Sequence, residues 1–203
     1  MEIHHLFPDP IYICRLGRVL TSGELKVLNT HKKKTYKNIG NLTSLNTYVL
    51  EQKKLKNLKR DLNKKISDYF KKIVCPSGPI IPYITQSWLN YTNPKGHHHR
   101  HSHTNSYISG VFYIEADEKI DKIHFYRLGH QPAVDLVIAK YNHFNSSSWW
   151  FPVGTGDLIL FPSFLVHGVD ETKGPNLRAS LSFNTFIKGK IGATSKLNSL
   201  LLE

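Results

Sequence analysis

Hydrophobic positions follow two different periods along the chain, and the change falls near residue 80. After Glu51, apolar residues recur at steps of three and four, namely Leu55, Leu58, Leu62, Ile66, Tyr69, Phe70 and Ile73. This spacing places them on one stripe of an amphipathic helix. Upstream, Thr21 and Glu24 have the spacing of a capping box, which predicts a shorter helix that ends near His31.

From residue 83 almost to the end, short apolar segments alternate with clusters of Gly, Pro, Asn and Ser. Such segments predict β-strands separated by turns. We expect eight strands, over residues 83–91, 107–114, 123–126, 134–141, 149–151, 157–161, 166–169 and 177–186. Eight short strands predict a mainly β fold, a jelly roll or barrel, supported by the N-terminal helices.

The chain shows neither an internal repeat nor a linker long enough to separate two domains. We therefore expect a single domain with three parts. A helical support region spans residues 1–80, the β core spans residues 81–188, and a loosely held C-terminal tail spans residues 189–203.

With 203 residues, of which 40% are hydrophobic, the chain can bury a packed core. Its longest apolar runs, residues 158–161 and 164–166, fall far short of the roughly 20 residues of a membrane-spanning helix, so we expect no membrane association. The first residues lack a signal pattern, which predicts a cytoplasmic protein. The two cysteines, Cys14 and Cys75, are too few for a disulfide framework, so we expect both to be reduced.

Positive charge is concentrated in the second predicted helix. The whole chain has 27 Lys and Arg against 15 Asp and Glu, a formal net charge of +12. Residues 51–72 contain nine basic and three acidic side chains and so supply +6 of it. We expect a solvated face, because no aromatic residues lie between these lysines on which nucleic-acid bases could stack. The alternative is a surface, extended by Lys32, Lys33, Lys34 and Lys37, that binds nucleic acid or an acidic protein.

Histidines form the most informative cluster. Five of the twelve histidines fall within residues 97–103. Side chains at positions i and i+2 of a strand project to the same face, so His101 and His103 can offer two imidazoles to one metal ion. His99 and His101 have the same spacing, so the sequence leaves open which of the two pairs binds the metal ion. His167 follows the strand predicted at 157–161 and is the best candidate for a third ligand, although a single histidine there would more often be structural.

A second polar feature lies in the last predicted strand. Arg178, Ser180, Ser182 and Asn184 alternate with apolar residues and therefore share one face. If that face points into a barrel, a polar ligand must fill it, since an unpaired buried polar group is unfavourable. Arg178 and Ser180 suit one end of a small dicarboxylate. The alternative is the solvent-exposed face of an edge strand.

Several short motifs are together more specific than any one of them. They are Ser87-Trp88-Leu89-Asn90, His101-Ser102-His103-Thr104-Asn105-Ser106, Ser109-Gly110-Val111-Phe112-Tyr113, Gly156-Asp157-Leu158-Ile159-Leu160-Phe161-Pro162-Ser163, His167 and Arg178-Ala179-Ser180. In this order and spacing the chain resembles the iron(II)/2-oxoglutarate dioxygenases, and more narrowly the small oxygenases of tailed phages and marine bacteria related to prolyl hydroxylases. The resemblance covers roughly residues 86–188, and residues 6–12 show a weaker similarity to the same family.

The resemblance implies a double-stranded β-helix and a complete set of site residues. It implies that His101, His103 and His167 bind Fe(II), and that Arg178, Ser180 and Tyr113 bind the remote carboxylate of 2-oxoglutarate. The implied reaction uses O2, converts 2-oxoglutarate to succinate and CO2, and oxidises a second substrate, for which a peptidyl proline, another protein side chain, a nucleobase and a small molecule all fit. Ascorbate is implied as an accessory reductant.

His103 departs from the family pattern, which has an aspartate or glutamate at this place. A neutral imidazole leaves the site one unit more positive than a carboxylate would. Three arrangements fit the sequence: His103 is itself a ligand, Asn105 takes the carboxylate place, or Glu115 or Asp117 supplies an oxygen. We favour the first.

Two other function classes fit parts of the sequence. A cupin shares the barrel and the His-x-His start, but it does not need the pair Arg178 and Ser180, and it usually has a glutamate where Tyr107 and Ile108 stand. A binding module would use the basic helix, and its histidines would be structural.

The residues that contact the second substrate carry no recognisable motif. We expect the segments 119–126 and 131–150 to face the substrate, since long connections over a barrel mouth usually carry specificity. Trp88, Asn90, Trp149 and Trp150 are candidates for shaping the substrate side of the pocket, although the tandem tryptophans would more often be packing residues.

Overall fold

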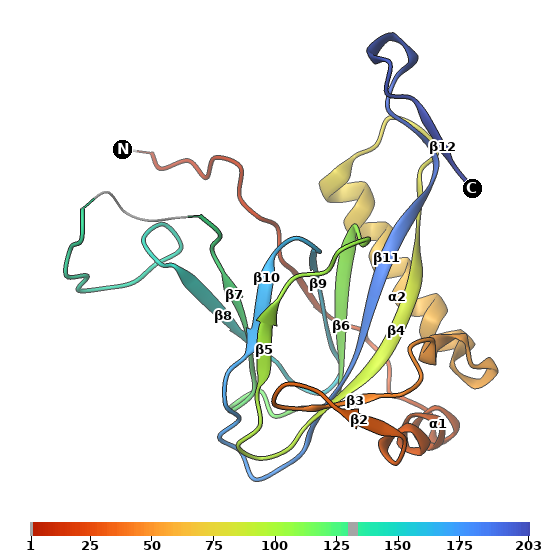
Figure 1. Cartoon of the computed structure of the whole chain (residues 1–203), viewed down its shortest axis with the longest axis vertical. Coiled ribbons are helices and arrows are strands. Elements are labelled where there is room, and N and C mark those ends of the chain that lie inside the picture. The colour runs from red at the N-terminus through yellow and green to blue at the C-terminus, as the bar shows by residue number, and fades with distance from the viewer. Residues whose placement is uncertain (1, 130–133) are drawn as a thin grey trace.

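The computed structural model, which describes residues 2–129 and 134–203, contains two antiparallel β-sheets (Figure 1). The larger sheet has the order β1 (Tyr12–Arg15), β9 (Asp157–Pro162), β6 (Ile108–Glu115), β11 (Arg178–Ile191), β4 (Ile81–Thr92), β3 (Leu42–Ser44) and β2 (Thr35–Lys37), and β12 (Leu200–Leu202) pairs with β11. The smaller sheet has the order β5 (His98–His101), β10 (Val166–Val169), β7 (Lys122–Tyr126) and β8 (Ser148–Pro152). This arrangement confirms the predicted mainly β jelly roll.

Two clusters of buried side chains hold the layers together. Between the sheets, Val111 of β6, Phe125 of β7 and Phe161 of β9 belong to one cluster. On the other face of the larger sheet, the apolar stripe of α2 (Lys56–Tyr69) packs into the second cluster. In Figure 1, α2 lies alongside β4 and β11. The helices therefore support the larger sheet from outside, as the sequence predicts.

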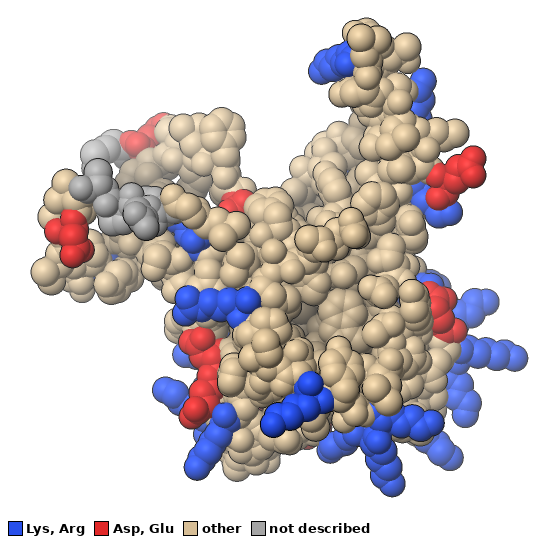
Figure 2. All heavy atoms as spheres, viewed as in Figure 1, with Lys and Arg blue, Asp and Glu red and all other residues tan. Residues whose placement is uncertain are grey.

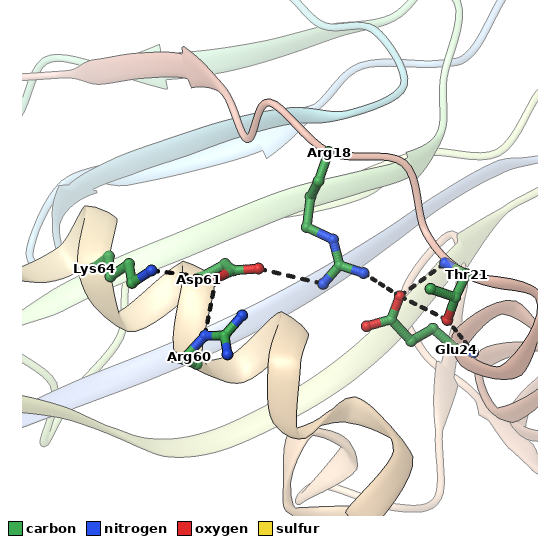
Figure 3. Close-up of polar contacts among 6 residues, drawn as sticks. All are labelled: Arg18, Thr21, Glu24, Arg60, Asp61 and Lys64. Atoms are coloured by element: carbon green, nitrogen blue, oxygen red, sulfur yellow. Dashed lines mark hydrogen bonds and ion pairs between the residues drawn. The ribbon is translucent and has the colours of Figure 1, made fainter.

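The first helix, α1 (Ser22–Lys32), begins with the predicted capping box. The Thr21 hydroxyl accepts a hydrogen bond from the Glu24 amide at 3.2 Å, and the Thr21 amide donates to the Glu24 carboxylate at 2.8 Å. Arg18 connects this helix start to α2, because its guanidinium contacts both the buried Glu24 carboxylate and Asp61 (Figure 3). The two ion pairs thus link α1 to α2 through the Arg18 side chain.

The second helix confirms the predicted solvated face and the predicted stripe up to Phe70, but Ile73, in the π-helical turn that follows, is 49% exposed, so including it in the stripe was wrong. Leu58, Leu62 and Ile66 are fully buried, whereas Figure 2 shows Lys and Arg side chains projecting into solvent along this side of the molecule. Part of the charge is neutralised locally, since Lys59 Nζ lies 2.5 Å from Glu51 Oε1. The helix therefore covers a sheet, and a role for its basic face in binding nucleic acid or an acidic protein stays a prediction.

The predicted strand at residues 134–141 is wrong. This segment belongs to the connection between β7 and β8, and its apolar side chains are exposed, to 67% at Val134 and fully at Val137. An apolar run forms a strand only where a neighbouring strand pairs with its backbone groups, and none does so here among the described residues. Residues 131–133 of the expected substrate-facing region lie outside the described residues.

Five short strands were not predicted, namely β1, β2, β3, β5 and β12. Each has only three or four residues, too few to show an alternating pattern. β11 also extends past residue 188, where we expected the core to end, and pairs Gly189 with Leu202. Part of the C-terminal segment therefore belongs to a hairpin, and the division into three parts otherwise stays a prediction.

Two further expectations concern membranes and cysteines. In the described part of the chain, no helix is long and apolar enough to cross a membrane. Cys14 and Cys75 are both free thiols. Cys14 packs against the core cluster, whereas Cys75 is exposed after the π-helical turn Phe70–Val74. Neither cysteine is placed for a disulfide.

One contact inside the larger sheet gives a stability prediction. Gly110 of β6 lies opposite Phe183 of β11, and a Cβ at Gly110 would stand 2.1 Å from the Phe183 ring. Gly110→Ala should lower the free energy of unfolding by about 1–3 kcal/mol, because Phe183 must leave its position. Urea denaturation measures this. Gly78→Ala is the control, since its Cβ would meet no atom within 4 Å, and equal effects of both changes would contradict the close contact.

Candidate active site

Three of the predicted ligands come together at one end of the smaller sheet. His101 of β5 and His167 of β10 are paired residues of adjacent strands, and their ring centroids lie 4.4 Å apart. His103, two residues beyond His101, lies 5.0 Å from His101 and 5.2 Å from His167, again between ring centroids. One ring nitrogen of each lies within 4.8 Å of the others, so the three can bind a single metal ion.

Backbone carbonyls fix the orientation of two of these rings. His101 Nδ1 lies 2.8 Å from the His99 carbonyl oxygen, and His167 Nδ1 lies 3.0 Å from the Leu165 carbonyl oxygen. A carbonyl oxygen only accepts, so each Nδ1 carries the proton and donates it. Each Nε2 therefore keeps its lone pair for a metal ion, the arrangement expected of a metal-binding histidine.

Burial keeps these imidazoles neutral. Loss of solvent lowers the pKa of His103 to about 4 and of His167 to about 3, and it also lowers the pKa of His101. Neighbouring imidazoles lower the pKa further. A metal ion at neutral pH would thus bind without displacing protons from the rings.

The three histidines line one side of a pocket between the sheets, and the polar face of β11 lines the other. Arg178, Ser180 and Ser182 are all buried there. β11 lies between β4 and β6, so the alternative of a solvent-exposed edge strand is wrong. The predicted inward-facing polar strand is confirmed.

Arg178 is a buried cation with no acidic partner. It is 3% exposed, and its Nη2 donates to the Tyr113 hydroxyl at 3.3 Å. Its Nε is buried and has no hydrogen-bond acceptor, and no carboxylate of residues 2–129 or 134–203 forms an ion pair with it. A buried unpaired charge is strongly unfavourable, so the pocket is suited to an anionic ligand.

Tyr113 and Ser180 complete this end of the pocket. Tyr113 is fully buried, and burial raises the pKa of its hydroxyl, which keeps it protonated. Because the Tyr113 oxygen accepts from Arg178, its own O–H remains available as a donor. Arg178, Tyr113 and Ser180 thus offer several donors to one carboxylate, as the resemblance implies.

A chain of hydrogen bonds fixes the remaining polar wall. The Asn90 amide donates to Ser182 Oγ at 3.0 Å, while its carbonyl oxygen accepts from Asn41 at 3.3 Å and from Thr43 at 3.2 Å. Asn90 thus lines the pocket, as does Trp88, whose ring centroid lies 5.6 Å from that of His103. Asn41 and Thr43 were not predicted, because their segment carries no motif.

Of the three arrangements considered at the second ligand place, only His103 lies beside His101 and His167. Asn105 is exposed in a turn with a positive φ of 53°. Glu115 and Asp117 line a different cavity on another part of the surface. The geometry thus favours the arrangement that we preferred from the sequence.

His98 was not among the predicted site residues, yet it lines the same pocket. The pairing of β5 with β10 shifts between His101, which pairs with His167, and His98, which pairs with Val169. Four residues of β5, His98 to His101, therefore lie opposite three of β10, residues 167–169, and this β-bulge turns His98 and His101 to the same face. Strict alternation would have placed them on opposite faces, so the sequence pattern could not reveal it.

A second groove is lined by parts of the N-terminal segment 4–11 and of residues 143–149, together with Phe125 and Leu165. The ring centroid of Phe125 lies 6.3 Å from that of His167. Trp149 lines this groove and contacts His143, whereas Trp150 is exposed and stacks against Lys122 at 3.6 Å from Nζ to the ring centroid. Of the two tryptophans, only Trp149 therefore lines this groove.

Comparison with known families indicates the class of the enzyme. Residues 86–184, nearly half of the chain, match the family described as "Putative 2OG-Fe(II) oxygenase", where 2OG denotes 2-oxoglutarate. No curated protein matches the chain. The matched segment begins in β4 and ends in β11, so it contains all the histidines, Tyr113, Arg178 and Ser180 of the pocket.

Solved structures share the fold at low sequence identity. A prolyl hydroxylase from Trichoplax adhaerens, in complex with a hypoxia inducible factor peptide, is 11% identical with a TM-score of 0.58, over 88% of this chain and 84% of that chain. HygX from Streptomyces hygroscopicus, with nickel, 2-oxoglutarate and hygromycin B bound, is 11% identical with a TM-score of 0.58, over 87% and 82%. A 2OG-Fe(II) oxygenase family member from Burkholderia pseudomallei is 11% identical with a TM-score of 0.54, over 81% and 79%.

These findings confirm the predicted double-stranded β-helix and the predicted enzyme class. The segment that forms the pocket matches the 2-oxoglutarate- and Fe(II)-dependent oxygenases, and the chain has the fold of solved members of that class. Its cofactors are accordingly Fe(II) and 2-oxoglutarate, with O2 as the oxidant.

Proposed function

We propose that the chain couples oxidative decarboxylation of 2-oxoglutarate to hydroxylation of a second substrate, with His101, His103 and His167 as the Fe(II) ligands. Arg178, Tyr113 and Ser180 bind the far carboxylate of 2-oxoglutarate in this proposal. The observation that carries it is the buried, acid-free guanidinium of Arg178 in the same pocket as three inward-facing imidazoles.

The residues present fit an Fe(II) ion. Three neutral imidazoles within 4.8 Å of one another supply one face of donors, and imidazole is a suitable ligand for iron. When bound, Fe(II) supplies the O2-dependent redox chemistry that the protein groups themselves lack. The carbonyls of His99 and Leu165 hold two of the ligating rings in place before the metal arrives.

The protein positions the co-substrate from its far end. Arg178 offers a planar pair of N–H groups, Tyr113 a hydroxyl and Ser180 a second hydroxyl, so a carboxylate there is held in one orientation. That orientation directs the 2-oxo acid end toward the histidines. The dicarboxylate also offsets the positive charge of a site whose protein ligands include no carboxylate.

Apolar side chains limit water in the pocket. Val111, Ile123 and Phe161 are buried in its wall and belong to the cluster between the sheets. Fixed donors interact more strongly with an anion in such surroundings than in bulk water. The apolar wall therefore strengthens the interaction between Arg178 and a bound carboxylate.

The second groove, along residues 143–149 and the N-terminal segment, is our candidate for the oxidised substrate. Its Phe125 ring lies 6.3 Å from that of His167, between centroids, and the groove overlaps the segments expected to face the substrate. The proposed substrate is a protein side chain such as proline or a small molecule, since the structural neighbours include complexes with a peptide and with hygromycin B. We place the enzyme in the cytoplasm, where its two free cysteines would stay reduced, with ascorbate as an accessory reductant.

Anaerobic titration of the metal-free chain tests the proposal. Fe(II) should bind at one equivalent, and 2-oxoglutarate should then produce a visible charge-transfer band, followed on exposure to O2 by succinate. The control is 2-oxopentanoate, which has the same chain but no far carboxylate and should bind at least about tenfold more weakly. Metal binding without any response to 2-oxoglutarate would favour a cupin-type enzyme, and absence of metal binding would favour a binding module.

A further inference from the structure

Two histidines outside the proposed iron set lie directly beside it. The ring centroid of His98 lies 4.6 Å from that of His101, and the centroid of His99 lies 4.9 Å from it. The His98 and His99 centroids are 5.2 Å apart. One ring nitrogen of each of the three lies within 4.8 Å of the others, the same spacing as in the iron set.

The β-bulge makes this second cluster possible. It turns His98 to the face of β5 that carries His101, so the two rings stack rather than point to opposite sides. Gly168 of β10 lies against the bulge, and a Cβ there would stand 3.0 Å from the His98 carbonyl oxygen. A larger residue at 168 would crowd this close approach, so the bulge depends on glycine as well as on the histidines.

The cluster also contains an unused polar atom. His99 Nδ1 is buried and has no hydrogen-bond partner among the described residues. The His99 carbonyl, in contrast, is occupied by His101 Nδ1. His101 can therefore bind a metal ion in either cluster only through Nε2. A single ring nitrogen cannot serve as a ligand to two metal ions at once.

We propose that His98, His99 and His101 form an outer metal site, which takes a divalent transition metal such as Zn(II) and competes with the iron set for His101. Both histidine sets lack a carboxylate, and at such a set the general order of divalent affinities places Zn(II) above Fe(II), so zinc can compete with iron here. The outer set is also more accessible, since its three histidines are only half-buried whereas His167 of the inner set is buried. Zinc at the outer site would withdraw His101 from iron, so this site would regulate iron occupancy.

A variant that lacks the inner set isolates the outer one. His103→Phe with His167→Phe removes two inner ligands and keeps ring volume. We expect this variant to bind one equivalent of Zn(II), measured by competition with a chromogenic chelator in the absence of 2-oxoglutarate and O2. Adding His98→Ala or His99→Ala should raise the Kd at least about tenfold, whereas adding His97→Ala should leave it unchanged, because His97 is exposed and packs against Gly40.

Three results would overturn the outer site. The double variant binds no zinc, or His97→Ala weakens binding as much as His98→Ala does, or anomalous diffraction from zinc-soaked crystals places the ion away from His98 and His99. Circular dichroism checks folding, and His103→Ala with His167→Ala replaces the phenylalanine pair if that pair does not fold. Because no turnover is measured, failure here is distinguishable from failure of the proposed oxygenase activity.

Discussion

His101→Ala should nearly abolish Fe(II) binding, raising the Kd at least about a hundredfold, or about 2.7 kcal/mol. His101 lies within reach of both other ligands, and its ring is held by the His99 carbonyl at 2.8 Å. Removing it leaves two imidazoles, which cannot hold the ion on one face. His167→Ala should have a similar effect, since that ring is buried and likewise fixed by a backbone carbonyl. Anaerobic calorimetry of the metal-free chain measures both Kd values.

The histidine run supplies its own controls. His97→Ala should leave the Kd for Fe(II) within about twofold of the parent, and His98→Ala should change it far less than His101→Ala does. His97 is exposed, and His98 lies in the pocket but outside the inner set. Equal losses for His97, His98, His101 and His167 would mean that the run binds metal nonspecifically, and the assignment of ligands would be wrong.

Local signals explain what could be predicted from the sequence. The capping box of Thr21 and Glu24 lies within four residues, and the alternation of the strand at Arg178 needs only a period of two. Both patterns were confirmed because no distant segment is needed to define them. The alternation left open whether the polar face of that strand points inward, and its position between β4 and β6 decides this.

Distant pairing explains what could not be predicted. The apolar residues near Val137 form no strand because no partner strand lies beside them, and a single sequence does not show partners. His98 enters the pocket only because β5 bulges where it meets Gly168. Asn41 reaches Asn90 from the turn between β2 and β3, two strands of three residues each that are too short to show an alternating pattern. Each depends on a contact between segments far apart in the chain.

Arg178→Lys should raise the apparent Kd for 2-oxoglutarate about tenfold, or about 1.4 kcal/mol. The ammonium group keeps the charge, but it loses the planar pair of N–H groups and the contact with Tyr113 at 3.3 Å. Arg178→Ala should raise the Kd at least about a hundredfold, because it removes the charge as well. The charge-transfer band of the Fe(II)-loaded chain, titrated anaerobically with 2-oxoglutarate, gives each Kd.

A comparison of two ligands shows whether Arg178 acts on the far carboxylate. 2-Oxopentanoate has no such group, so its Kd should be nearly the same in the parent and in Arg178→Lys, within about twofold. Only 2-oxoglutarate should lose affinity. The coupling free energy between the Arg178→Lys substitution and the removal of the far carboxylate from the ligand measures the Arg178–carboxylate interaction directly. Arg60→Lys, at an exposed position of α2, controls for the substitution itself. If both ligands weaken equally, Arg178 supports the pocket without binding the carboxylate, and if neither weakens even in Arg178→Ala, the far carboxylate is bound elsewhere.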